Sequence, residues 1–181
     1  MENRQNLKTL NLVYVAIGAA LIVICSWISI PTAVPFTLQT FAVFLLLLLL
    51  GGKRGTLSVI VYILLGLVGL PVFAGFSGGP GVLLGSTGGY IIGFIFMGLI
   101  HICASKFFEN NSLAEVISLI IGLIVCYAFG SVWFMYIYMR DTGEVGFVTV
   151  LLWCVIPFIV PDLIKLALAF LISKRVKGYI K

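Results

Sequence analysis

The chain has very little charge, and its long apolar runs leave little room for a water-exposed surface. Only 9% of its 181 residues are charged and 62% are hydrophobic, whereas a soluble domain carries roughly 25% charged residues. A soluble globular protein is therefore excluded. A membrane β-barrel is disfavoured too, because barrel strands alternate apolar and polar residues over about ten positions. We expect an all-α integral membrane protein.

Side chains that build catalytic and metal sites are also scarce. The one histidine, His101, stands alone near the end of an apolar segment, and the four cysteines lack a CxxC spacing. Cysteines scattered in this way, one to an apolar segment, favour helix packing over disulfides or metal ligation. The chain also lacks a Walker A pattern, so any ATP-driven step must come from partner subunits. We expect no cofactor in the chain itself.

Six apolar stretches indicate six transmembrane helices, since about 20 residues cross the hydrocarbon core. We place them at residues 9–30, 37–51, 55–72, 87–106, 113–138 and 147–173. We interpret the first as a retained helix, because it lacks the small-residue cleavage site of a signal peptide. No linker or change of composition marks a second domain, so we expect one six-helix membrane domain over residues 1–181.

The basic residues predict how these helices are oriented. Nine of them fall in segments that share one side of the membrane: Arg4, Lys8, Lys53, Arg54, Lys106, Lys174, Arg175, Lys177 and Lys181. The other side has Arg140, accompanied by Asp141 and Glu144. Because Lys and Arg accumulate in cytoplasmic segments, both termini are predicted to be cytoplasmic. This distribution explains the formal net charge of +5 without a nucleic-acid partner.

An acid and an amine, Asp162 and Lys165, lie inside the last apolar stretch. At about 1.5 Å per residue they are roughly 18 and 13 Å from the cytoplasmic edge, where a charge costs about 2.5–3.5 kcal/mol. Residues three apart share a helix face, so we interpret the pair as the polar floor of a binding site. A cyclic urea would suit it, because the carboxylate accepts hydrogen bonds and the ammonium donates them. The alternative is a plain ion pair that neutralises itself.

The surroundings of this pair favour a cavity. Pro157 and Pro161 each remove a backbone donor, and broken helix at membrane depth is tolerated where it lines a cavity. Residues 29–39 and 73–90 are uncharged and rich in Pro or Gly, and we interpret both as lids. The second offers glycine amides just ahead of a helix start at Ser86 or Thr87, which favours an anion such as a carboxylate. A glycine-rich turn that serves packing only is the alternative.

Small residues four apart occur in two of the predicted helices. Ala16 and Ala20 lie in the first, and Gly89 and Gly93 lie in the fourth. Small side chains let helices approach closely in lipid. The spacing leaves open whether the partner helix belongs to this chain or to another subunit.

Five motifs, in order along the chain, resemble those of the BioY family, the biotin-specific S components of energy-coupling factor (ECF) transporters. They are Val34-Pro35-Phe36-Thr37-Leu38-Gln39-Thr40-Phe41, Gly52-Lys53-Arg54-Gly55, the segment 66–75, Gly85-Ser86-Thr87-Gly88-Gly89-Tyr90, and Pro161-Asp162-Leu163-Ile164-Lys165. The resemblance covers nearly the whole chain. It implies a six-helix subunit of the bacterial plasma membrane that captures biotin from outside and passes it to an ECF energising module.

The resemblance also assigns roles to residues. It implies that Asp162 and Lys165 meet the ureido ring of biotin, and that further substrate contacts come from Gln39, Phe36, Ser77, Thr87 and Tyr90. The biotin carboxylate is expected near the glycine-rich loop. Ala16 and Ala20 are expected to pack against a transmembrane coupling subunit, itself bound to two ABC-type ATPases. The remaining surface would face membrane lipid.

Three other functions stay open on the residues alone. The chain could be an S component for another vitamin, or a small intramembrane channel with Asp162 and Lys165 as a relay. A membrane enzyme is the third, but one histidine and one intramembrane carboxylate are too few for a nucleophile with its base.

Overall fold

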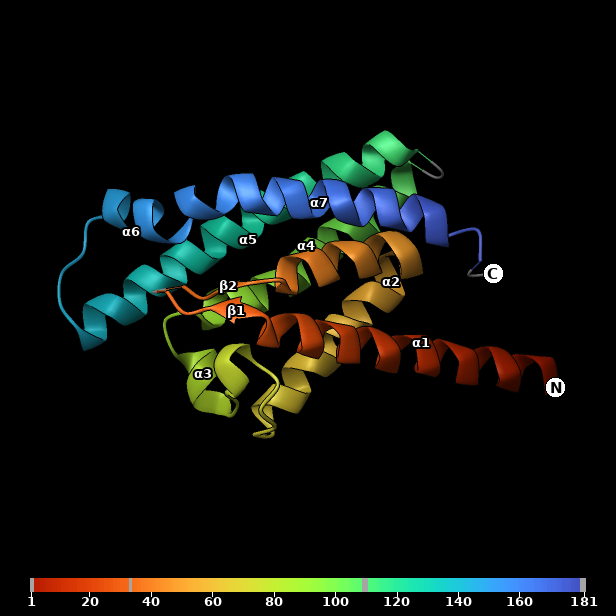
Figure 1. The fold of residues 1–181 in the computed structure, drawn as a ribbon, viewed down its shortest axis with the longest axis horizontal. Helices are drawn as coiled ribbons and strands as arrows, with labels where there is room; N and C mark the ends of the chain where they lie inside the picture. Colours follow the sequence, from red (N-terminus) through yellow and green to blue (C-terminus); the bar gives the residue numbers. More distant parts are fainter. Residues whose placement is uncertain (1, 33, 109–110, 180–181) are drawn as a thin grey trace.

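The computed structural model describes residues 2–32, 34–108 and 111–179, with side chains from residue 8 onward. The long helices are α1 (Glu2–Trp27), α2 (Gln39–Leu67), α4 (Gly88–Phe107), α5 (Ser112–Asp141) and α7 (Ile156–Val176). The short elements are β1 (Ser29–Ile30), β2 (Phe36–Thr37), the 3-10 helix η1 (Ala74–Phe76), α3 (Pro80–Leu84) and α6 (Phe147–Cys154) (Figure 1). A helix satisfies its own backbone hydrogen bonds, which the bilayer core demands.

The long apolar helices confirm the prediction of a helical membrane protein. Among the described residues, five helical stretches are long and apolar enough to cross a membrane. They are Lys8–Trp27, Gln39–Leu67, Gly88–Phe107, Ser112–Asp141 and Phe147–Val176. The count differs from the predicted six because the predicted spans 37–51 and 55–72 both fall largely within α2.

A sharp bend divides α2 into two halves. Gly51 at the bend has φ 78° and ψ 166°, a conformation that glycine adopts without steric cost. Just beyond it the chain returns so closely that a Cβ on Gly55 would lie 3.0 Å from the Cα of Leu47. The two halves accordingly run in different directions (Figure 1).

Other predicted boundaries need correction. The predicted first span, 9–30, ends too late, because α1 stops at Trp27 and Ser29–Ile30 pairs with Phe36–Thr37 as an antiparallel hairpin. The third, 55–72, also ends too late, because the chain leaves the helix after Leu67 and turns at Gly69, which has φ 103°.

The last predicted span, 147–173, is broken into α6 and α7 as the prolines suggested. The break lies at Val155, which has φ −124° and ψ −57°. Pro157 follows it in the first turn of α7, where a missing N–H costs little because that group has no intrahelical partner. Pro161 remains inside α7. The fourth and fifth predicted spans agree with α4 and α5 to within a few residues.

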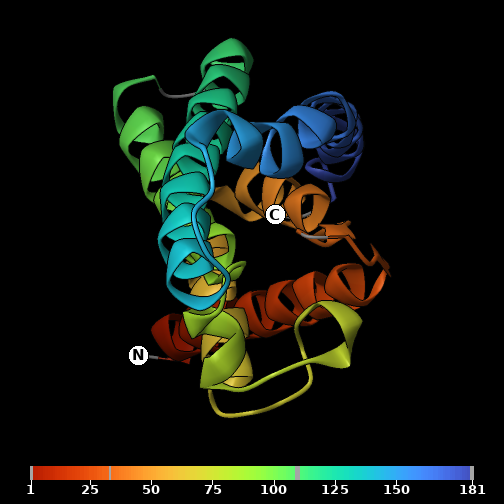
Figure 2. The same ribbon diagram turned by 90° about the vertical axis from the view of Figure 1, so that its left-hand side faces the viewer.

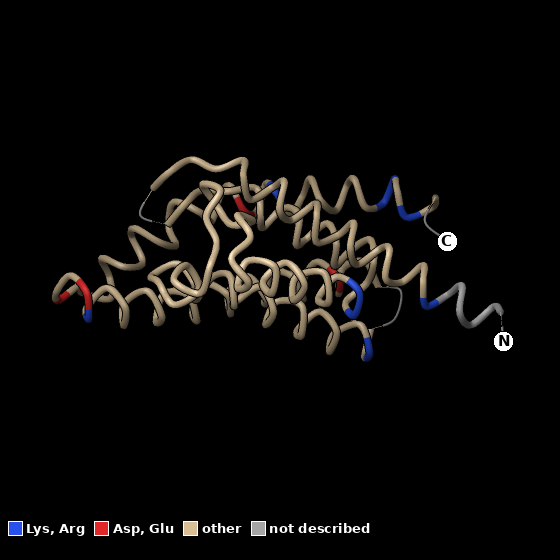
Figure 3. The backbone as a smooth tube through the Cα atoms, turned by 90° about the horizontal axis from the view of Figure 1, so that it is seen from below, with Lys and Arg blue, Asp and Glu red and all other residues tan. Residues whose placement is uncertain are grey.

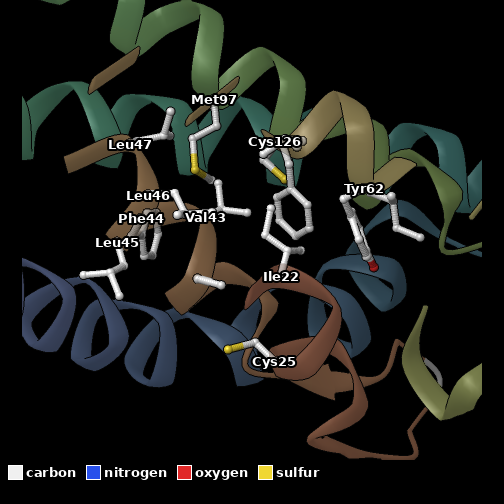
Figure 4. Close-up of a cluster of buried hydrophobic side chains, with 14 of the residues drawn as sticks. Ile22, Cys25, Val43, Phe44, Leu45, Leu46, Leu47, Tyr62, Met97 and Cys126 are labelled. Carbon is white, nitrogen blue, oxygen red and sulfur yellow. The ribbon is translucent and has the colours of Figure 1, made fainter. Parts of the chain in front are cut away.

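The helices pack around α2. It contacts α1, α4 and α7, while α4 packs along α5. Viewed from one end, α1 lies below, α7 above and the start of α2 between them, with α4 and α5 to one side (Figure 2). Met97 of α4 reaches toward Val43 and Leu46 of α2, and Ile22 of α1 completes the same buried cluster (Figure 4).

Gly89 and Gly93 supply the close contact expected of small residues, and their partner is α5 of the same chain. A Cβ on Gly93 would lie 2.7 Å from the Sγ of Cys126, and one on Gly89 would overlap Trp133. The open question about these two glycines is therefore answered: they pack internally.

Charges separate along the molecule. Lys and Arg gather at the end that holds both termini, and an acidic pair with a basic neighbour marks the opposite end (Figure 3). Asp162 and Lys165 lie between these ends, within α7.

Candidate substrate-binding site

A cavity of about 130 Å³ lies where α2, α4, α5 and α7 meet the two loops. Both segments interpreted as lids contribute to its wall. The lining residues are Val34, Pro35, Thr37, Gln39, Thr40, Phe73, Ala74, Ser77, Val82, Thr87, Tyr90, Ile91, Phe94, Cys126, Tyr127, Cys154, Phe158, Asp162 and Lys165. The wall is mainly apolar with a few polar groups, as is usual for a small-molecule site.

Asp162 forms the polar floor with hydrogen bonds from two other helices. Its side chain is 2% exposed. Its Oδ1 accepts from Thr40 Oγ1 and from Lys165 Nζ, both at 2.8 Å, and its Oδ2 accepts from Tyr127 OH at 2.6 Å. A carboxylate has about four acceptor positions, so the protein leaves roughly one for an N–H group of a ligand.

Lys165 is held just as firmly. Its ammonium donates to the carbonyl oxygen of Thr37 at 2.7 Å, to Thr40 Oγ1 at 3.1 Å and to Asp162 at 2.8 Å. It also lies 4.3 Å from the ring centroid of Phe36, a cation–π distance. An ammonium has three N–H donors, and all three have protein acceptors. A ligand carbonyl must therefore share or replace one of these contacts.

The pair is thus an ion pair and also part of a cavity wall. The alternative of two charges that cancel each other describes the 2.8 Å contact correctly, but it does not account for the cavity beside them. Because the charges balance, the floor suits an uncharged group that carries both donors and an acceptor.

Gln39 adds an oriented amide to the same wall. Its Oε1 accepts from the hydroxyl of Thr37 at 2.9 Å, and its Nε2 donates to the hydroxyl of Tyr62. Thr37 Oγ1 also accepts from the backbone N–H of Gln39 at 3.2 Å. Since Tyr62 is fully buried in the core, the start of α2 is fixed relative to the second half of that helix.

The structure brings most of the predicted substrate residues together. Asp162, Lys165, Gln39, Ser77, Thr87 and Tyr90 all line the cavity. Thr87 is the N-cap residue of α4, which confirms the predicted helix start. Phe36 is not among the lining residues, but its ring stacks on that of the lining residue Phe158 at 5.7 Å between centroids.

Ala16 and Ala20 lie apart from the cavity. They are exposed on α1 and line a shallow apolar groove of about 490 Å³, together with Ala19, Val23, Ile24, Trp27, Val61 and Leu65. The structure therefore separates the predicted partner-binding residues from the predicted substrate-binding residues.

A family model described as the BioY family matches residues 1–181. The chain belongs to the BioY family. It is 46% identical to the biotin transporter BioY of Thermotoga maritima, over 92% of this chain and 95% of that protein. It is 40% identical to a probable biotin transporter BioY of Pyrococcus horikoshii, over 91% and 94%. A crystal structure of the S-component for biotin from an ECF-type ABC transporter superimposes with a TM-score of 0.83 at 32% identity, covering 96% of this chain and 93% of that one.

Two polar residues of the site in this BioY chain escaped the sequence analysis. Thr40 bridges Asp162 and Lys165, and Tyr127 of α5 reaches Asp162 from across the cavity. Thr40 follows Gln39 directly and could have been found as a second polar residue in the first turn of α2. Tyr127 gave no such signal, because a lone tyrosine in an apolar helix is equally typical of packing.

The second loop of this BioY chain is attached to the end of α1. Ser26 Oγ donates to the carbonyl oxygen of Val72 at 2.5 Å, and Trp27 Nε1 donates to that of Pro71 at 2.9 Å. The rings of Trp27 and Phe76 stack at 5.0 Å between centroids. Phe76 has φ 56°, an unusual value for a bulky residue. These contacts attach the loop, which forms part of the cavity wall, to the end of α1.

Proposed function

We propose that this chain is the biotin-capturing S component of an ECF transporter. The observation that carries the proposal is the balanced pair Asp162–Lys165 in the wall of a largely apolar cavity, in a chain whose relatives are named biotin transporters. Biotin combines a cyclic urea with an apolar ring and a carboxylate. In this arrangement a urea N–H donates to Asp162, the urea carbonyl accepts from Lys165 or Gln39, and the apolar ring lies among Phe94, Ile91 and Phe158.

The carboxylate end of biotin is proposed to point toward the second loop. Ser77 and Thr87 line that part of the cavity, and Thr87 is the N-cap residue of α4, where the positive end of the helix dipole favours an anion. Lys165 is the one cation among the described residues that line the cavity, and it is engaged at the floor. The carboxylate therefore relies on hydroxyl and amide donors.

Capture requires the loops to move. The cavity of about 130 Å³ is smaller than the roughly 300–1,000 Å³ of most small-molecule pockets. We propose that residues 68–87 swing away from Trp27 to admit biotin and close again behind it. The uncharged composition of both loops suits that cycle, because they can cover a ligand without burying an unpaired charge.

The chain is proposed to cross the bacterial plasma membrane six times, with both termini in the cytoplasm. The bend at Gly51 lets the two halves of α2 count as separate crossings, and basic residues gather at the end that holds both termini (Figure 3). On this proposal residues 1–181 work as one membrane domain that holds no cofactor.

Transport is proposed to need partner subunits. The groove around Ala16 and Ala20 would receive the transmembrane coupling subunit, since small exposed residues let a helix approach closely. Two ABC-type ATPases bound to that subunit would use the ATP.

Equilibrium binding of labelled biotin to the purified protein tests the function. Unlabelled biotin should compete, whereas riboflavin, thiamine and folate should not. Competition by one of those vitamins in preference to biotin would assign a different substrate. A current that depends on the proton gradient, without any vitamin bound, would support the channel alternative and reject ours.

A further inference from the structure

Another groove lies at the basic end of the molecule, away from the substrate cavity. It has a volume of about 390 Å³ and is lined by Lys8, Asn11, Leu12, Val15, Lys53, Arg54 and Leu57. The first four belong to α1, and the last three follow the bend at Gly51 in α2. Three cations and one amide thus converge on a groove between two helices.

Polarity changes along this groove in one direction. Leu12 is four residues beyond Lys8 in α1, and Leu57 is four beyond Lys53 in α2, so each lies about one helical turn, roughly 6 Å, further from the charged end. Leu12 is 66% exposed and Leu57 is 45% exposed, and Val15 forms the buried floor between the helices. The groove therefore has a cationic mouth and an apolar interior.

The cations at the mouth are available to a ligand. Among the described side chains, the ion pairs join Arg140 to Asp141, Lys165 to Asp162 and Lys177 to Glu115, and none of these uses Lys8, Lys53 or Arg54. Arg54 is positioned by the ring of Tyr14, whose centroid lies 5.7 Å from its guanidinium carbon. A fixed guanidinium is a suitable donor to phosphate oxygens, which it can contact with two N–H groups.

We propose that this groove binds one anionic phospholipid, with its phosphate among Lys8, Lys53 and Arg54 and an acyl chain along Leu12, Val15 and Leu57. The lipid and the groove match in polarity: the charged phosphate would lie among the cations, and the hydrocarbon chain attached to it would lie along the apolar side chains. Basic pockets between membrane helices recognise anionic head groups in this way. A phosphate without acyl chains would leave the apolar half of the groove unused.

Native mass spectrometry of the delipidated protein tests the site, with phosphatidylglycerol and phosphatidylcholine of identical acyl chains as probes. The unchanged protein should bind phosphatidylglycerol more tightly. Each lost cation should weaken that binding roughly fivefold, so the triple variant K8Q/K53Q/R54Q should lose on the order of 100-fold. The single variants K8Q and K53Q should each bind phosphatidylglycerol roughly fivefold more weakly than the unchanged protein.

A matched variant, K106Q/K174Q/R175Q, removes three charges from the same end outside the groove. It should keep its preference for phosphatidylglycerol. Equal losses in the two triple variants, or no preference in the unchanged protein, would overturn the proposal. Displacement of the lipid by an equal concentration of glycerol 3-phosphate would also overturn it, because the acyl chain would then contribute nothing.

Two further readouts separate this site from its neighbours. K8Q/K53Q/R54Q should bind labelled biotin with the same affinity as the unchanged protein. Such a result would show that the variant is folded and that the lipid site can be tested independently of the proposed function. If K8Q/K53Q/R54Q retained its lipid but no longer assembled with a coupling subunit, the groove would be a protein-docking surface, and the lipid proposal would be wrong.

Discussion

The hydroxyl of Tyr127 in α5 donates a 2.6 Å hydrogen bond to Oδ2 of Asp162 in α7. Both residues line the cavity, and this bond fixes the carboxylate, which also accepts hydrogen bonds from Thr40 and Lys165. The orientation of Asp162 thus depends on three helices, α2, α5 and α7. A ligand meets a preorganised acceptor, which lowers the cost of binding.

Replacing Tyr127 by Phe should weaken biotin binding by roughly tenfold, because a hydrogen bond to a charged group contributes about 1.5 kcal/mol or more. Titration of labelled biotin measures the change. Tyr136→Phe is the matched control, since Tyr136 lies on the same helix but is exposed outside the cavity. Equal affinity for Tyr127→Phe and the unchanged protein would show that Tyr127 has no part in fixing Asp162.

The contact between Trp27 and Phe76 offers a test of whether the second loop restrains bound biotin. Replacing Phe76 by Ala removes the stacked pair, which is worth about 0.5–1.5 kcal/mol, so biotin should dissociate roughly 2- to 12-fold faster. A chase of bound labelled biotin with an excess of unlabelled biotin gives the rate. Phe108→Ala, an exposed aromatic outside the loop, should leave it unchanged. An unaltered rate for Phe76→Ala would mean that this contact does not restrain the loop.

Substitutions at Ala16 and Ala20 test assembly with a coupling subunit independently of biotin binding. The double change Ala16→Leu and Ala20→Leu fills the groove on α1 and should abolish co-purification with a coupling subunit while leaving biotin affinity within about twofold, because the groove does not share residues with the cavity. Ala128→Leu with Ala167→Leu is the control, since both alanines are exposed on other helices. Normal assembly of the Ala16/Ala20 variant would reject the docking role.

The sequence sufficed to find Asp162 and Lys165 because any ionisable group in an apolar run is costly enough to need an explanation. It could not show that Tyr127 and Thr40 complete the site, since that depends on which faces of α2, α5 and α7 meet. Spacing likewise predicted that Gly89 and Gly93 accept a close neighbour, but only the fold identifies α5 as that neighbour.

Helix ends were harder to predict than helix existence. The prolines correctly predicted an interrupted last span, but the break falls at Val155 because Pro157 is tolerated in the first turn of a helix. The gap between the predicted spans 37–51 and 55–72 agrees with the bend in α2, which lies at Gly51. Its positive φ is a property of the folded backbone that composition does not reveal.

The most direct test concerns Asp162 and Lys165 together. Asp162→Asn alone leaves Lys165 as a buried unpaired charge, which costs about 3–5 kcal/mol, so lost binding could reflect lost structure. The double change Asp162→Asn with Lys165→Met removes both charges, and it should recover much of the thermal stability that Asp162→Asn alone loses. Equilibrium binding of labelled biotin to this folded double variant should be reduced at least 100-fold relative to the unchanged protein. Unreduced binding would mean that the pair only neutralises itself and that biotin is held elsewhere.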